Sequence, residues 1–246
     1  MNYQLAISHT QIIECRSLFN SELEMQESFE KLSLLSGFYE HSVIQGTEIV
    51  CSTQSWYSQS QLTPVVFLAS HTTNQSLNDS FFFSEEKGKI HRFWKVLNNL
   101  GVVNIYFQEN QEIETLKQNI ISGFSNQHNT KYSVSIDCFF SLPCDSVATL
   151  KNIFGDSAFV NLCQLSKESF LERLKANTSR KPVIITFQKD VFNTMSNGET
   201  VYSQDLAFNG ILVFENSEYK LIGLPAMRWI YAENYKNTLQ QIFNRL

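Results

Sequence analysis

Short apolar runs alternate with amphipathic helical segments along this chain from residue 63 onward. Residues 65–69, 158–162 and 182–187 have the length and the apolar composition of buried strands. Helical patterns lie between them, among them residues 90–100, where apolar side chains recur three and four positions apart. This alternation predicts an α/β fold, a three-layer α/β/α sandwich around a mainly parallel central sheet that contains all three runs.

Other segments fit the same architecture. Residues 131–140 alternate between apolar and polar positions, which predicts a strand with one polar face. Near the N-terminus, Ser21 and Glu24 fit the capping box of a helix that Gly37 ends. We therefore expect an N-terminal extension with a helix (residues 1–62) and an α/β domain (residues 63–246). Within that domain, further helices are predicted from Pro143 to Gly155 and over residues 166–176, 189–195 and 233–246, and further strands over residues 210–214 and 219–224.

The composition limits the cellular compartments and the binding partners that are expected for this protein. The formal net charge is −5, so any contact with nucleic acid phosphates needs a local basic patch. The five cysteines are odd in number and form no C-x-x-C pair, which argues for a reducing compartment and against a structural metal. The start of the chain lacks the pattern of a secretion signal, and no apolar run approaches the length of a membrane span. These features predict a cytoplasmic monomer that does not contact membranes.

Residues 63–101 are the stretch around which the α/β domain is expected to be organised. Its strand is followed by a polar loop that includes His71, and then by Phe81, Phe82 and Phe83 among polar neighbours. In open α/β sheets, ligands bind beyond the carboxyl ends of the strands, where such loops lie. The three rings either close a core, which is the commoner role, or stack on a flat ligand.

Three segments, in this order, resemble the uracil-DNA glycosylase superfamily. Residues 65–97 comprise a strand, a loop, aromatic residues and the run H-R-F-W, where relatives of the mismatch-specific and deoxyinosine glycosylases have N-R-F-W. Residues 154–165 resemble the segment of single-strand-selective glycosylases that carries the base-reading asparagine. Residues 182–195 and 221–228 occupy the place of the family's late strand and of its H-P-S-P type motif.

The chain also departs from the family pattern. The family's first motif has a glycine, a catalytic Asn or Asp and a proline beside a strand end, whereas residues 69–73 read A-S-H-T-T. The histidine of the last motif is missing, and residues 224–226 read L-P-A in its place. His91 stands where relatives have asparagine. These departures predict that any excision of ordinary uracil is weak or absent.

The resemblance implies an enzyme that hydrolyses the N-glycosidic bond of a damaged or modified base, after that base has left the stack and entered a pocket. Its partner would be single- or double-stranded DNA with a flipped base, and we expect neither a cofactor nor a metal. The resemblance implies these roles: His71, with Ser70 and Thr72, positions the attacking water; Phe83 or Phe82 stacks on the base; Asn161 and His91 contact the base; and Arg228 contacts DNA.

Each role has a structural alternative. His71 and His91 can be surface side chains, and Asn161 can satisfy the end of a strand. Arg228 can stack on its neighbour Trp229. Asp137, Cys138 and Cys144 are interpreted as structural.

Three hypotheses remain open from the sequence. The first is a divergent DNA glycosylase with an altered pocket. The alternative is a catalytically inactive module of the same fold that binds nucleic acid or a protein partner. The third is an unrelated α/β protein. The acidic charge and the altered motifs favour the second, whereas the phenylalanines and Asn161 favour the first.

Overall fold

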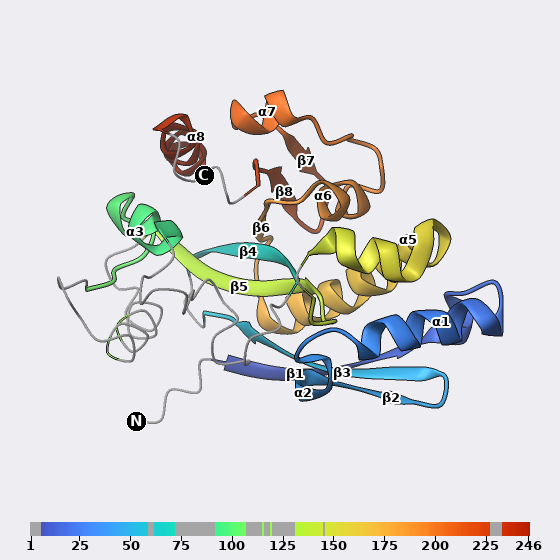
Figure 1. Ribbon diagram of the computed structural model, residues 1–246. Coiled ribbons are helices and arrows are strands. Elements are labelled where there is room, and N and C mark those ends of the chain that lie inside the picture. Colours follow the sequence, from blue (N-terminus) through green and yellow to red (C-terminus); the bar gives the residue numbers. More distant parts are fainter. Residues whose placement is uncertain are drawn as a thin grey trace.

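The computed structural model describes residues 6–58, 62–71, 92–106, 115, 119, 131–144, 146–226 and 233–246 (Figure 1). Its strands are β1 (Ala6–Glu14), β2 (Ser42–Gln45), β3 (Glu48–Trp56), β4 (Thr63–His71), β5 (Tyr132–Phe140), β6 (Val183–Thr186), β7 (Val213–Glu215) and β8 (Lys220–Gly223). Its helices are η1 (Cys15–Ser17), α1 (Glu22–Ser33), α2 (Phe38–His41), α3 (Arg92–Asn99), α5 (Val147–Asn177), α6 (Lys189–Met195), α7 (Gln204–Phe208) and α8 (Glu233–Arg245).

The strands form one mixed sheet in the order β1-β3-β5-β4-β6-β8-β7, with β2 paired to β3 beside this path. The four central strands, β5, β4, β6 and β8, are parallel to one another. The strands at both margins pair antiparallel with their neighbours. The predicted strands at residues 65–69 and 182–187 are direct neighbours, with Val65 opposite Val183. The prediction of an α/β fold with a parallel centre is therefore confirmed.

The prediction of a strand at residues 158–162 is wrong, because this run is part of helix α5. Its side chains are buried at Ala158, Phe159 and Leu162, while Val160 is 57 % exposed. Burial then continues through Phe170, at the spacing that places side chains on one helix face. A short apolar run is ambiguous between strand and helix, and here its helical continuation decided the outcome.

Helix α5 has a break near the position that the sequence predicts. Gly155 has φ 73° and ψ 169°, which are not helical angles, so the chain bends there before the helix resumes. The first part begins at Ser146, whose hydroxyl accepts a hydrogen bond from the Thr149 backbone N–H at 3.1 Å. The expected helix therefore ends near Gly155 as predicted, but it starts at Val147, four residues after Pro143, rather than at Pro143.

Alternate side chains of the central strands enter two apolar clusters. Val65 and Phe67 pack with residues of α3 and α8, whereas Val66 and Leu68 pack with residues of α1, α5 and α6. Figure 1 shows α3 and α8 on one side of β4 and β5, and α5 on the other. Since α5 packs against β5, that strand is buried at every position, and its expected polar face is not exposed to water.

The N-terminal extension belongs to the same sheet and the same core. β3 joins the central strands where Trp56 lies opposite Ile136, and Ile13 of β1 belongs to the apolar cluster that contains α5. Helix α1 confirms the predicted cap, because the Ser21 hydroxyl accepts from the Glu24 backbone N–H at 3.2 Å. The sequence did not predict β1. In the parts of the chain that are described, no helix is both long and apolar enough to cross a membrane.

Candidate functional site

The strand order places a topological switch between β4 and β6. The chain runs from β4 to β5 on one side and then crosses to β6 on the other side of β4. Connections that leave in opposite directions open a crevice at the carboxyl ends of these two strands, which is where open α/β sheets bind ligands. Ser70 lies half-buried at this end of β4, and the backbone of His71 completes the strand opposite Phe140. The two predicted residues are therefore at the expected edge.

The ends of β6 and β8 lie next to β4, in this order, at this edge of the sheet. The Leu224 backbone N–H donates to the Thr186 carbonyl at 2.8 Å, which continues the pairing of the two strands beyond Gly223. Half-buried Gln188 follows β6, and its Oε1 accepts from the Asp190 N–H at 2.6 Å. Sequence reasoning missed Gln188, although its position directly after the run at 182–187 was a usable signal. Its amide caps α6 and is therefore already engaged.

Two tyrosine hydroxyls hold the loop that follows β8. Tyr202 donates to the Leu224 carbonyl at 3.0 Å, and Tyr235 of α8 donates to the Pro225 carbonyl at 3.2 Å. Burial raises the pKa of both phenols, so both remain neutral donors at ordinary pH. The Leu224 and Pro225 carbonyls are thus held by hydroxyl groups from two different segments.

Removing one of these hydroxyls is expected to loosen the loop without creating a cavity. Tyr235→Phe should lower the free energy of unfolding by about 0.5–1.5 kcal/mol, because the Pro225 carbonyl loses its donor. Urea denaturation followed by circular dichroism measures this loss. Tyr39→Phe is the matched control, since the Tyr39 side chain is 61 % exposed, and it should change little. Equal effects of the two substitutions would contradict the role given to Tyr235.

Asn161 is not brought to this edge from a strand end as expected. It lies on an exposed face of α5, and its Nδ2 donates to the Leu18 carbonyl at 3.3 Å. This bond ties α5 to the N-terminal extension. The expected contact between Asn161 and a base depended on the strand that the structure does not contain.

Five predicted site residues lie outside the described part of the chain: Thr72, Phe82, Phe83, His91 and Arg228. The side chain of His71 lies outside it as well. The roles given to these residues stay predictions.

A second polar centre is buried between β5 and α5. The Asp137 carboxylate is fully buried and accepts from the Tyr57 hydroxyl at 2.8 Å. It also accepts from Nε and Nη2 of Arg173 at 3.0 and 3.1 Å, and from the Cys138 backbone N–H at 2.7 Å. Arg173 donates further to the Ser169 hydroxyl and to the Cys138 carbonyl, each at 2.8 Å. Every oxygen of the carboxylate is thus engaged.

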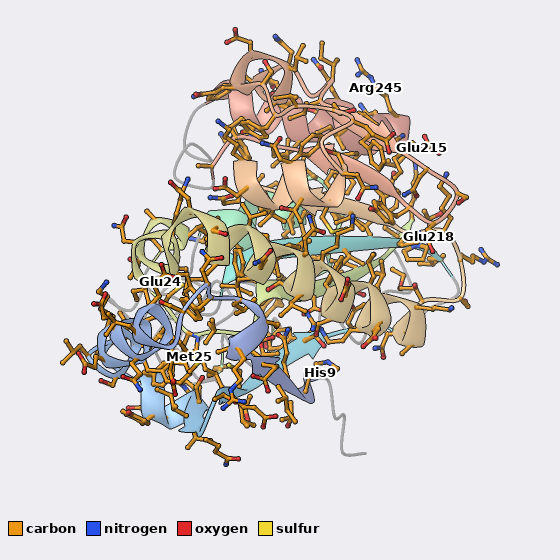
Figure 2. All side chains as sticks on the ribbon, turned by 90° about the vertical axis from the view of Figure 1, so that its right-hand side faces the viewer. His9, Glu24, Met25, Glu215, Glu218 and Arg245 are labelled. Atoms are coloured by element: carbon orange, nitrogen blue, oxygen red, sulfur yellow. The ribbon has the colours of Figure 1, made fainter. Side chains whose placement is uncertain are left out.

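This network joins the segment after β3 to the centre of the sheet. Burial, and then the neighbouring negative charge of Asp137, raise the pKa of Tyr57, so its hydroxyl stays a donor. His9 lies on β1 below α5 in Figure 2, where it contacts the Ser55 hydroxyl. Burial lowers the pKa of His9 more than Asp137 raises it. The full pairing and the burial of Asp137 support the structural role expected for it.

In comparisons with known proteins, no protein-family model and no curated protein matches the chain. Within the described residues, His, Cys, Asp and Glu side chains form no group of three or more that could hold a metal ion.

Proposed function

We propose that this protein is a divergent DNA glycosylase of the uracil-DNA glycosylase superfamily, which excises a damaged or modified base by hydrolysis of the N-glycosidic bond. The observation that carries the proposal is the position of Ser70 and His71 at the carboxyl end of β4, beside the switch to β6. The proposal includes a three-layer α/β/α domain, and the two apolar clusters support this architecture. It also includes a cytoplasmic protein that acts on DNA as a monomer.

In the proposed reaction, DNA presents a flipped base to the edge formed by β4, β6 and β8. Ser70 and His71, at the carboxyl end of β4, position the attacking water on the far side of the sugar carbon. The resemblance assigns stacking on the base to Phe82 or Phe83 and contact with DNA to Arg228. Asn161 takes no part, and the Gln188 amide is engaged in capping α6. A contact to the base edge must therefore come from another residue.

A catalytically inactive module of the same fold, binding nucleic acid or a protein partner, is the second candidate. The position of Asn161 favours it, because its amide is bonded to Leu18 on an exposed helix face. The net charge of −5 also favours it, because DNA binding is driven largely by basic groups.

Base release from synthetic DNA separates the two candidates. Single- and double-stranded oligonucleotides that contain uracil, hypoxanthine or a modified cytosine are incubated with the protein, and abasic sites are cleaved with alkali and resolved on gels. Uracil release should be weak or absent, because the loss of one donor to a departing anion typically costs a factor of about 10²–10³ in rate. Release of a modified base should be lost in His71→Ala.

Asn161→Ala is the matched control, since the structure places that amide on α5, and it should leave release unchanged. Robust uracil release that survives His71→Ala would show that the site is misplaced. Stable binding of an oligonucleotide without release of any base would support the inactive module. Neither binding nor release on any strand would overturn both candidates.

A further inference from the structure

A polar groove lies at the end of the sheet opposite Ser70. It is formed where β4 and β5 begin and where α5 ends, and Pro64, Ser133 and Asn177 line it from these three elements. Its volume is about 570 Å³, within the range of roughly 300–1,000 Å³ that is common for small-molecule sites. The groove is separate from the proposed glycosylase site, so it does not depend on that proposal.

The floor of the groove consists of hydroxyl groups held in place. Ser133 and Ser135 lie on the same face of β5 and are each 2 % exposed. The Ser58 backbone N–H donates to the Ser135 Oγ at 3.0 Å, and the Ser58 carbonyl accepts from the Ser133 Oγ at 3.5 Å. A hydroxyl that accepts one hydrogen bond still carries its own hydrogen, so Ser135 can donate to a ligand.

The floor of the groove ends beside the buried ion pair of Asp137 and Arg173. Asp137 lies two positions beyond Ser135 on the same face of β5, and its carboxylate is fully engaged by Tyr57, Arg173 and Cys138. The groove therefore meets a saturated polar group rather than a free carboxylate. No unpaired negative charge from Asp137 opposes an anion bound there.

The wall of the groove comes from the last turn of α5 and the residues after it. The Thr178 hydroxyl donates to the Leu174 carbonyl at 2.7 Å, and the Asn177 amide donates to the Arg173 carbonyl at 2.8 Å, so this turn is rigidly capped. Ser179 adds a further hydroxyl. Lys175 is exposed, and among the described residues that line the groove it is the one that carries a charge.

The remaining lining is apolar and comes from Leu62, Pro64 and Ala176. Several hydroxyls, one ammonium group and a small apolar surface match a particular kind of ligand. Sugar hydroxyls both donate and accept, as serine and threonine hydroxyls do, and the C–H face of a sugar ring packs on apolar side chains. One ammonium group can bind one anionic group. A phosphate fits this role because its oxygens are strong hydrogen-bond acceptors.

We propose that this groove binds a small phosphorylated sugar. Ser135 and Ser179 bind the sugar hydroxyls, the Leu62 and Pro64 side chains contact the ring, and Lys175 binds the phosphate. The Lys175 side chain is exposed, so its replacement removes the charge without disturbing the core.

Isothermal titration calorimetry with ribose 5-phosphate tests the proposal, with glucose 6-phosphate, ribose and inorganic phosphate titrated separately. We expect saturable binding of at least one sugar phosphate, and at least tenfold weaker binding of ribose and of inorganic phosphate. Lys175→Met should weaken sugar phosphate binding about ten- to a hundredfold, because a charge-assisted hydrogen bond is lost. The matched control is Lys95→Met, which removes an exposed lysine from α3 on the other side of the sheet and should leave binding unchanged.

Equal affinity of the wild type and Lys175→Met for the sugar phosphate would overturn the assignment of the groove. Equal affinity for inorganic phosphate and for the sugar phosphates would overturn the role of the hydroxyls. Absence of saturable binding for both sugar phosphates would overturn the proposal as a whole. These results leave the base-release assay unaffected, so failure of one proposal is distinguishable from failure of the other.

Discussion

Replacement of Arg173 by methionine is expected to lower the free energy of unfolding by about 3–5 kcal/mol. The Asp137 carboxylate is fully buried, and Arg173 supplies two of the hydrogen bonds that it accepts. Without the guanidinium, this negative charge stays in the interior with only Tyr57 and the Cys138 N–H as donors. A buried charge that loses its partner carries a large desolvation cost, so the folded state is strongly destabilised.

Urea denaturation of Arg173→Met and of Lys181→Met, each compared with the wild type, measures this effect. Lys181 is the matched control because it forms an ion pair with Glu215 at 2.7 Å that is open to solvent. Exposed pairs contribute little to stability, so the loss in Lys181→Met should be much smaller. Similar losses in the two variants would contradict the structural role of the Asp137–Arg173 pair.

Gly223→Ala is expected to destabilise the protein by about 1–3 kcal/mol through overpacking. A Cβ atom on Gly223 would lie 2.4 Å from Cδ2 of Leu212 and 2.8 Å from Cδ2 of Phe192, which is closer than non-bonded carbons can approach. Gly223 is also the last residue of β8, directly before the loop that Tyr202 and Tyr235 hold. The substitution should therefore disturb the candidate site as well as the core.

A double-mutant cycle with Leu212→Ala tests the cause of this loss. Leu212→Ala removes the atom nearest to the added methyl group, so the double variant should lose less stability than the sum of the two single variants. Urea denaturation of the four proteins supplies the comparison. Strict additivity would show that the contact with Leu212 is not the source of the strain.

Local sequence patterns determined several elements of this protein. The runs that became β4 and β6 are apolar and are bounded by turn residues or proline, so their state follows from a few neighbouring positions. The same holds for the start of α1, where Ser21 and Glu24 make the expected capping bond. The position of Ser70 and His71 at a strand end also followed from the sequence, because polar residues replace the apolar run there.

Only the tertiary structure decided the features that depend on distant segments. Residues 158–162 are helical because their apolar side chains continue the buried face of α5, a continuation that a five-residue run does not reveal. Asp137 reads as a polar residue on a strand, yet it is buried because Arg173 on α5 and Tyr57 after β3 supply its hydrogen bonds.

The same distinction applies to the candidate site. The sequence placed Ser70 and His71 at a strand end, but it did not specify what lies across from them. Gln188 and Leu224–Pro225 lie at that edge because β6 and β8 assemble on one side of β4 while β5 lies on the other. Strand order is set by the packing of helices that are distant in sequence, and short-range periodicity carries no record of it.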